Sequence, residues 1–311
     1  MKVCFCGLGS IGKRHLQNLT QLAAEMGTTP VVHALRATAN PLDQDTKKRL
    51  ARAATDVREL DWDYDLAFIT NPTGLHFEAL KLLAPRAKNL FIEKPVFDGG
   101  AYSLEAIKMR PGGVYYVAGP LRYAPVIGAL KTLVVGRRVY CVRVICSSYL
   151  PDWRPGTDYR QSYSAQKALG GGVDIDLIHE WDYIVALFGF PKKVHRLCGK
   201  YSALEIDSCD AAVYIAEYDG MLVELHLDYF GRAVRREIEL FTEQATVTGD
   251  LIRNTVAFSD GRPPIRFQEG ENDSYLRELR FVLGCIESGR AFNNIRHCCA
   301  VLDIALGRGA T

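Results

Sequence analysis

One segment in the second half of the chain combines glycines, acids and a histidine at spacings that suit proton transfer. It reads GGGVDIDLIHEWD over residues 170–182. On a helix over residues 173–188, Asp176 and His179 are three residues apart and lie on one face. A carboxylate beside an imidazole orients the ring and raises its pKa, which suits an acid or base near neutral pH. Asp174 falls towards the apolar side of this helix, so it is expected to cap the helix start.

Two other interpretations of this segment stay open. Asp176 and His179 also fit the solvent-facing side of an ordinary amphipathic helix. A metal site would need another ligand at close spacing; the sequence offers none, so no metal is expected. The glycines at 170–172 favour proton transfer, because they let the helix start approach another backbone or a ligand closely.

A glycine-rich motif at the start of the chain indicates a nucleotide site. The strand-like KVCFC leads into GLGSIG at residues 7–12, and a helix-like segment continues to about Glu25. In G-x-G-x-x-G the glycines permit a tight turn and close approach to a pyrophosphate, and the helix N-terminus attracts its charge. The residues expected to contact a cofactor here are Gly7, Gly9, Ser10, Ile11 and Gly12.

The residue after the second predicted strand bears on the choice of cofactor. NAD-specific sites usually have an acid there, which binds the ribose 2′-hydroxyl. No Asp or Glu occurs between Met26 and Leu42, and Arg36 follows the strand over residues 30–35. Because an arginine suits a 2′-phosphate, NADP(H) is favoured and NAD(H) is the alternative.

Further predicted strands over residues 65–70, 89–95 and 112–119 alternate with helices. This alternation indicates a doubly wound, parallel α/β sheet, that is, a Rossmann domain over residues 1–119. Ligands of such sheets lie beyond the carboxyl ends of the strands. Six further candidates fall there: Thr70, Asn71, Pro72, His76, Glu93 and Lys94. A cis bond before Pro95 would fix the direction of the lysine.

The pattern changes after Gly119. Long strands in succession, with a hairpin signal at Asp219-Gly220, predict a large, open and mostly antiparallel sheet in an α+β domain over residues 120–311. An open sheet face must be covered, so a homo-oligomer, a dimer or tetramer, is expected. Aromatic and arginine side chains suited to sugars and acids are candidate substrate contacts: Arg122, Tyr123, Trp153, Arg154, Tyr159, Arg160, Tyr163 and Arg232.

Four motifs together resemble the Gfo/Idh/MocA family of oxidoreductases. They are GLGSIGKRH, TNPTGLHFEAL, EKP and the glycines followed by D, H and D, in the family's order and over essentially the whole chain. Residues 148–163, SYLPDWRPGTDYRQSY, followed by the glycine segment, look like a subgroup often encoded near sialic-acid-type sugar synthases.

The resemblance implies a sugar dehydrogenase with Lys94 and His179 as catalytic residues and Asp176 as partner. In the inositol dehydrogenase pattern the acid and histidine are four residues apart; here the two candidate aspartates stand three and five residues before His179. The substrate would be a sugar or sugar derivative, acidic or nucleotide-linked. The alternatives are a redox-neutral epimerase or lyase with a tightly bound cofactor, and a non-catalytic regulator that senses the cofactor or a sugar.

The composition is that of a globular protein. The 311 residues are 48% apolar and 24% charged, with a formal net charge of +2. This balance argues against nucleic acid or an anionic membrane as main partner. The nine cysteines sit mostly in apolar segments and are expected to be reduced core thiols of a cytoplasmic protein.

Overall fold

The computed structural model describes residues 1–308 and divides into two compact units. Unit 1 comprises Met1–Ala118 and Tyr275–Cys299; unit 2 comprises Gly119–Ser274 and the chain from Ala300 onward. The first boundary lies within one residue of the predicted one. Unlike the predicted division, the unit assignment places the segment from Tyr275 to Cys299 with the N-terminal part of the chain.

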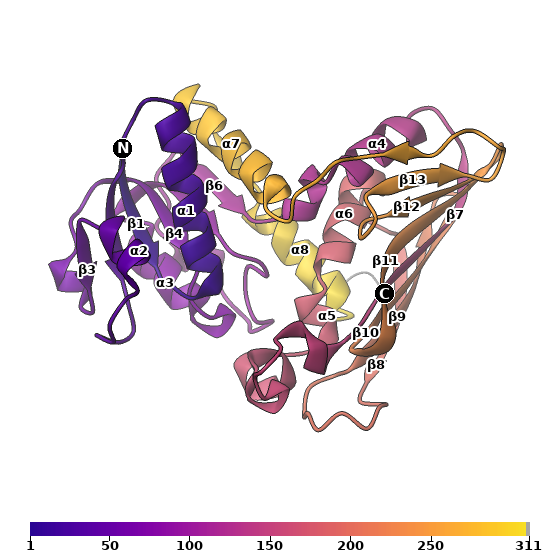
Figure 1. Cartoon of the computed structure of the whole chain (residues 1–311), viewed down its shortest axis with the longest axis horizontal. Coiled ribbons are helices and arrows are strands. Elements are labelled where there is room, and N and C mark those ends of the chain that lie inside the picture. The colour runs from indigo at the N-terminus through magenta and orange to yellow at the C-terminus, as the bar shows by residue number, and fades with distance from the viewer. Residues whose placement is uncertain (309–311) are drawn as a thin grey trace. The chain divides into compact units, whose positions relative to one another are not determined.

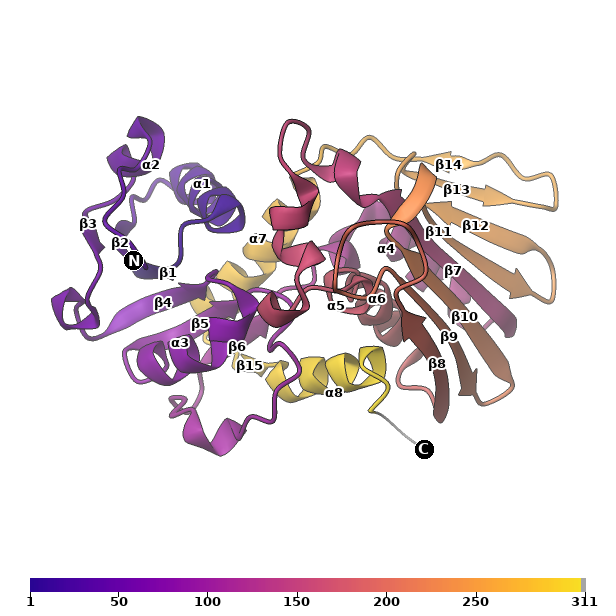
Figure 2. The same cartoon turned by 90° about the horizontal axis from the view of Figure 1, so that it is seen from below.

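Unit 1 is built on a seven-stranded parallel sheet with the strand order β15-β6-β5-β4-β1-β2-β3. Because connections between parallel strands are right-handed, the helices after β1 and β4 must cover opposite faces, as α1 and α3 do in Figure 2. The elements of this unit are β1 (Lys2–Cys6), α1 (Ser10–Glu25), β2 (Val31–Leu35), α2 (Gln44–Lys48), β3 (Arg52–Ala54), β4 (Tyr64–Ile69), α3 (His76–Leu83), β5 (Ala87–Ile92), β6 (Val114–Val117), α7 (Asp273–Glu287) and β15 (Phe292–Asn293); α8 (Ile295–Ala305) follows.

A row of aromatic rings crosses this sheet and supports α1. Phe5, Phe68, Phe91 and Tyr116 stand opposite one another on neighbouring strands. Their ring centroids lie 4.3, 5.1 and 5.5 Å apart in that order. His15 of α1 packs on the row, with its ring 4.7 Å from that of Phe91. Such pairs add stability beyond the area they bury, so the row fixes the helix that follows the glycine turn.

Unit 2 is built on an eight-stranded sheet with the order β14-β13-β12-β11-β7-β10-β9-β8, visible as a fan in Figure 2. All neighbours pair antiparallel except β10 and β7, so the predicted mostly antiparallel sheet is confirmed. The elements are α4 (Pro125–Val134), β7 (Val139–Tyr149), α5 (Val173–Asp176), α6 (His179–Phe188), β8 (Lys193–Gly199), β9 (Ala211–Tyr218), β10 (Met221–Asp228), β11 (Phe230–Thr242), β12 (Thr246–Asp250), β13 (Thr255–Phe258) and β14 (Ile265–Arg266).

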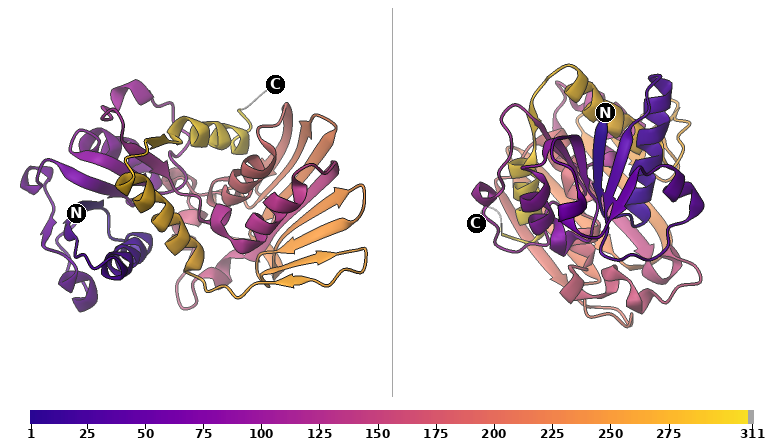
Figure 3. Two further views of the ribbon diagram at one scale, coloured as in Figure 1. Left: turned by 90° about the horizontal axis from the view of Figure 1, so that it is seen from above. Right: turned by 90° about the vertical axis from the view of Figure 1, so that its left-hand side faces the viewer.

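The two faces of this sheet differ in burial. The helices α4, α5 and α6 lie over one face, as Figures 1 and 3 show. Tyr214 and Val223 point into that layer and are fully buried, whereas Val213 and Ile215 point the other way and stay partly exposed. The Asp219-Gly220 hairpin is confirmed, since Tyr218 pairs with Met221 across it. Within residues 1–308, no helix has the length and apolar character required to cross a membrane.

Candidate active site

In unit 1, the backbone brings the predicted cofactor residues to one edge of the sheet. The amides of Gly7, Thr70 and Glu93 donate to the last or nearly last carbonyls of neighbouring strands, at 2.9 Å each. Because β1, β4 and β5 are parallel and in register, the residues that follow them stand side by side. The structure therefore places the glycine turn, Thr70 and Glu93 at the carboxyl edge, where ligands of such sheets bind.

The three glycines of the turn differ in whether the packing of the protein requires a glycine at that position. A Cβ on Gly7 would lie 2.7 Å from the backbone of Asn71, and a Cβ on Gly12 would lie 2.6 Å from the Gly7 carbonyl. The Thr70 hydroxyl donates to that same carbonyl at 2.7 Å. These two glycines are therefore required by the packing of the protein itself.

Gly9 is the exception. A Cβ on Gly9 would meet nothing within 4 Å, and its φ of −69° is accessible to any residue. Gly9 caps α1, and Ser10 and Ile11 open the helix with no acidic side chain in its first turn. Nothing in the fold requires a glycine here, so the absence of a side chain fits close approach of a ligand to the helix N-terminus.

Arg36 follows β2 directly, as predicted. Its backbone amide donates to Ala54, and its guanidinium donates to the Asn40 carbonyl at 2.5 Å. Asp43 lies just beyond the segment between Met26 and Leu42 that contains no acid. Its carboxylate accepts a hydrogen bond from Lys13 of α1 at 2.7 Å. Arg36 and Asp43 are thus a positive and a negative side chain that follow β2 in the sequence.

Asn71 and Pro72 form a loop after β4, and the side chain of His76 supports this loop. The His76 ring is buried, with Nε2 3.0 Å from the Asn71 carbonyl and Nδ1 3.2 Å from the Val96 carbonyl. Burial lowers the pKa of His76, so its ring is neutral at pH 7. With only 1% of its surface exposed, His76 holds the segment of Asn71 and Pro72 in place, and its contact with a cofactor stays a prediction.

Glu93 forms a buried polar pair with His15 at this edge. Its Oε1 lies 2.5 Å from Nε2 of the fully buried His15, and its Oε2 accepts from the Lys94 backbone amide at 3.2 Å. Burial opposes ionisation of Glu93, but the bond to His15 and the nearby positive groups outweigh it and hold the pKa of Glu93 below its usual value. The pair fixes the backbone at Lys94, whose side chain is half-buried and whose peptide bond to Pro95 is cis.

In unit 2, the predicted continuous helix over residues 173–188 is interrupted. It consists of α5, which ends at Asp176, and α6, which begins at His179. The interpretation of Asp174 as a helix cap is wrong, because its carboxylate is buried and paired with Arg196. His179 opens α6 and remains half-exposed.

Asp176 has a partner that the sequence pattern did not indicate. The hydroxyl of Tyr229, which is fully buried, donates to Asp176 Oδ2 at 2.5 Å. Burial and the charge of Asp176 raise the pKa of Tyr229 far above its usual value, so the hydroxyl stays protonated. The indole of Trp153 packs edge-on against Tyr229 at 5.3 Å, which ties the candidate substrate loop to Asp176.

Two predicted substrate arginines are already engaged within unit 2. Arg122 grips Asp182 of α6 in a bidentate pair, with Nε 2.6 Å from Oδ2. The guanidinium of Arg232 lies 3.6 Å from the ring centroid of Tyr149. Arg122 and Tyr123 lie in a short turn over residues 120–123. The partner of Arg122, Asp182, stands three residues after His179 on α6, so Arg122 has a structural role beside the candidate proton carrier.

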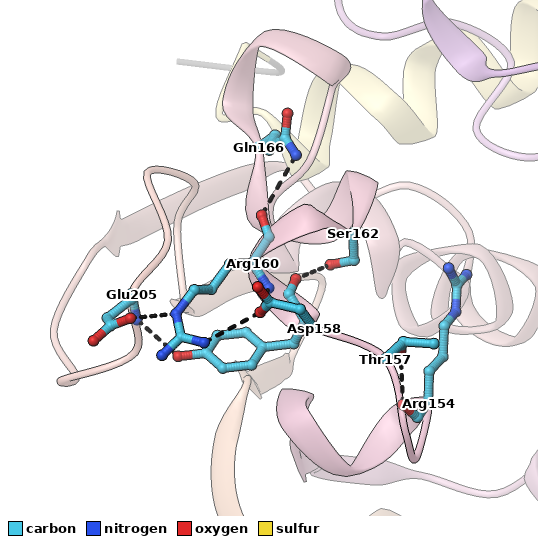
Figure 4. A network of polar contacts seen from close by, with 8 residues as sticks. Arg154, Thr157, Asp158, Arg160, Ser162, Gln166 and Glu205 are labelled. Atoms are coloured by element: carbon cyan, nitrogen blue, oxygen red, sulfur yellow. Dashed lines mark hydrogen bonds and ion pairs between the residues drawn. The ribbon is translucent and has the colours of Figure 1, made fainter.

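Figure 4 shows how the loop around Arg160 is ordered. Arg160 pairs with Asp158 and Glu205, and the Glu205 amide donates to the Tyr159 hydroxyl at 3.1 Å. The exposed guanidinium of Arg154 points away from this network. Arg154 is the loop arginine better placed for an anionic ligand, because Arg160 already serves two carboxylates.

The packing of the loop that contains Arg160 explains why Gly171, the middle of the three glycines at residues 170–172, is a glycine. A Cβ on Gly171 would lie 2.1 Å from the Tyr163 carbonyl and 2.7 Å from that of Ser164. Gly172 has a φ of +145°, which side chains rarely adopt. The glycines therefore let the loop pack directly against the start of α5.

His15 and Tyr229 are the site residues that sequence reasoning missed. A histidine on the apolar face of α1 was a weak signal, and a tyrosine just after a long strand was none. Both act through partners far along the chain, Glu93 and Asp176. Such pairings follow from tertiary structure, not from local spacing.

The comparisons with known proteins agree with this architecture. Residues 1–109 match the GFO_IDH_MocA model, described as "Oxidoreductase family, NAD-binding Rossmann fold". The chain is 26% identical over 298 residues to the "Uncharacterized oxidoreductase YrbE" of Bacillus subtilis (strain 168), covering 88% of this chain and 83% of that protein. It is 26% identical over 291 residues to the "Putative UDP-kanosamine synthase oxidoreductase subunit" of Amycolatopsis mediterranei (strain S699), covering 85% and 78%.

A solved structure shares the two-unit fold. Levoglucosan dehydrogenase in complex with NADH and levoglucosan superposes with a TM-score of 0.82 at 20% identity, covering 98% of this chain and 95% of that one. The resemblance inferred from the motifs is thus confirmed in the N-terminal residues that carry GLGSIG, TNPTGLHFEAL and EKP. The chain thus resembles the Gfo/Idh/MocA family of oxidoreductases, whose NAD-binding Rossmann model its residues 1–109 match.

Proposed function

We propose that this chain is an NAD(P)-dependent dehydrogenase that moves a hydride between the nicotinamide and a hydroxyl or keto carbon of a sugar derivative. The observation that carries the proposal is Gly9, whose missing side chain serves no packing need of the protein but fits a pyrophosphate at the start of α1. Sugar-directed names among the similar proteins, UDP-kanosamine and levoglucosan, support the substrate class.

The residues are proposed to divide the work. The bound nicotinamide supplies or accepts the hydride. His179 takes the hydroxyl proton during oxidation and returns it during reduction, and Asp176, held by Tyr229, is its proposed partner. Lys94 is proposed to donate to the substrate oxygen, from a backbone that the His15–Glu93 pair holds in place.

An acidic or nucleotide-linked sugar is the proposed substrate. The exposed guanidinium of Arg154 is the proposed anion contact, since Arg160 and Arg122 already pair with carboxylates of the protein. The aromatic side chains of the same loop, Trp153, Tyr159 and Tyr163, are proposed to contact the sugar face.

NADP(H) is the favoured cofactor in this proposal. Arg36 stands directly after β2, and its guanidinium suits a 2′-phosphate. NAD(H) is the alternative, supported by Asp43, which pairs with Lys13 at the first turn of α1.

The experiment is a fluorescence titration of NADPH and NADH with four proteins: wild type and the variants Gly9→Ala, Arg36→Asp and Asp43→Asn. Gly9→Ala should keep the wild-type melting temperature, because its Cβ enters open space, and should weaken both cofactors at least about tenfold, ~1.4 kcal/mol. Arg36→Asp should reverse a preference for NADPH.

The outcomes separate the alternatives. If NADH binds better, and Asp43→Asn weakens its binding whereas Arg36→Asp does not, the 2′-phosphate proposal is wrong and the NAD(H) alternative holds. If Gly9→Ala binds both cofactors as tightly as wild type, the nucleotide site is not at the glycine turn.

We also propose that the chain forms a homo-oligomer through the exposed face of the eight-stranded sheet. Apolar Val213 and Ile215 are 38% and 39% exposed there, beside a hollow of about 410 Å³. Four of the charged side chains around it are paired with one another, Arg143 with Glu224 at 2.8 Å and Arg235 with Glu237 at 2.6 Å. A surface with exposed apolar groups and internally satisfied charges favours a second copy as its cover.

A further inference from the structure

A cluster of three potential metal ligands lies in unit 2, apart from the residues assigned roles above. The ligand atoms of Asp174, Cys198 and Cys209 all lie within 4.8 Å of one another. They come from three segments: the first turn of α5, the strand β8 and the chain just before β9. Asp174 is 4% exposed, and the two thiols are half-buried.

The donor atoms match one class of ion. Two thiolates and a carboxylate suit zinc and similar thiophilic divalent cations far better than magnesium or calcium. Around a tetrahedral zinc, with Zn–S near 2.3 Å and Zn–O near 2.1 Å, ligand atoms stand about 3.7 Å apart. The ligand atoms of the observed cluster, all within 4.8 Å of one another, exceed this spacing by at most about 1 Å, and water would fill the fourth position.

The surroundings balance the charge of such a site. Arg196 pairs with Asp174 Oδ2, and its positive charge together with that of a divalent cation offsets two thiolates and one carboxylate. A carboxylate can bind a metal through one oxygen and an outer partner through the other, and such partners orient the ligand. Gly172 leaves the other oxygen unobstructed, since a Cβ there would lie 2.8 Å from Asp174 Oδ1.

We propose that Asp174, Cys198 and Cys209 bind a thiophilic divalent cation, with zinc as the first choice. The ion joins the start of α5 to the edge of the sheet, two residues before Asp176. It thereby fixes the short helix from which Asp176 reaches Tyr229. The site is independent of the proposed cofactor and substrate. It differs from the sequence-based expectation of no metal, because ligands from three distant segments leave no recognisable spacing in the sequence.

The test is metal analysis of tag-free protein purified under reducing conditions without chelator. Wild type should carry about one zinc per chain by mass spectrometry. Asp174→Asn, Cys198→Ser and Cys209→Ser should each lose most of it, whereas Cys141→Ser, a half-buried cysteine of β7 outside the cluster, should keep it.

Cobalt titration of the metal-free protein provides a readout that needs no variant. Wild type and Cys141→Ser should develop a thiolate-to-cobalt charge-transfer band and the strong visible bands of a tetrahedral site, saturating at one ion. Added zinc should abolish these bands and raise the melting temperature, because an ion that binds only the folded state stabilises it.

Two results would overturn the proposal. One is reduced, metal-free wild type that takes up neither zinc nor cobalt at micromolar concentrations. The other is a Cys198–Cys209 disulfide in the protein as isolated, with no metal uptake after reduction, which would mark the two thiols as a redox pair instead. Neither result bears on cofactor binding at Gly9.

Discussion

The buried hydroxyl of Tyr229 donates a hydrogen bond to the buried carboxylate of Asp176. Tyr229→Phe removes this donor and leaves a buried carboxylate with one partner fewer, which costs about 1–3 kcal/mol. Thermal unfolding should show this loss, and kcat should fall more than KM rises. Tyr218→Phe, which removes a bond to the Gly189 carbonyl at 3.1 Å, is the matched control. Equal effects of the two changes would argue against a special role for Tyr229.

The lowered pKa of Glu93 predicts how the stability of the fold depends on pH. Burial raises its pKa, but His15 and nearby positive groups lower it further, so the folded pKa lies below the ordinary value. A depressed carboxyl pKa stabilises the fold above the unfolded pKa of about 4.3. That stability is lost as pH falls through the folded value. Urea midpoints of wild type and Glu93→Gln should therefore differ most near pH 7 and converge below pH 4. Glu78→Gln, which removes an exposed carboxylate on α3, is the control variant, and a difference for Glu93→Gln that does not change with pH would contradict the account.

For single residues, the sequence patterns predicted which positions lie at the site better than they predicted the hydrogen-bond and ion-pair partners of those residues. The glycine turn, Thr70, Glu93 and Lys94 follow from strand-helix alternation, and the structure places the turn, Thr70 and Glu93 at the expected sheet edge. The partners of Asp174, Arg122 and Asp176 could not be predicted, because each lies on a segment that only the tertiary fold brings close.

At the scale of elements, the break between α5 and α6 is the main departure from the predicted helix. A period of 100° fits residues 173–188 throughout, but at the break the amides of Ile178 and Glu180 donate to carbonyls three residues earlier in the chain instead of four. Hydrophobic periodicity indicates which residues face the core. The apolar residues before and after the break face the same side, so the periodicity gives no sign of the break. The long strands and the Asp219-Gly220 hairpin were predictable, since alternation and turn chemistry act locally.

Gly171 is the element-scale test of how the substrate loop meets α5. Gly171→Ala would place a Cβ 2.1 Å from the Tyr163 carbonyl, so the loop must shift, at a cost of about 1–3 kcal/mol. We expect a lower melting temperature and a raised KM for substrate. Gly128→Ala on α4, where a Cβ meets nothing within 4 Å, should instead leave KM unchanged and stabilise the helix by up to about 1 kcal/mol. A Gly171→Ala enzyme with wild-type KM would disconnect this loop from substrate binding.

At the scale of the whole molecule, the open sheet predicts self-association. Ile215→Glu places a charge on the exposed face and should shift the mass measured by light scattering towards the monomer, because an unpaired buried charge is costly. Val135→Glu, at a residue that is 76% exposed just after α4, should leave the mass unchanged. A monomeric wild type, or an oligomer that tolerates Ile215→Glu, would contradict this interface.

The central claim is that the chain catalyses hydride transfer to or from a sugar with His179 as the proton carrier. The most direct measurement is the change in nicotinamide absorbance at saturating cofactor with a panel of free, acidic and nucleotide-linked sugars, for wild type and His179→Asn. We predict net oxidation or reduction by wild type with at least one sugar, and a loss of about 100-fold or more in kcat for His179→Asn, with unchanged cofactor affinity. Net turnover that survives in His179→Asn would contradict the assigned role. Isomerised sugar without net absorbance change would contradict the dehydrogenase claim and favour a redox-neutral reaction, and a cofactor bound tightly with no turnover of any sugar would favour a regulator.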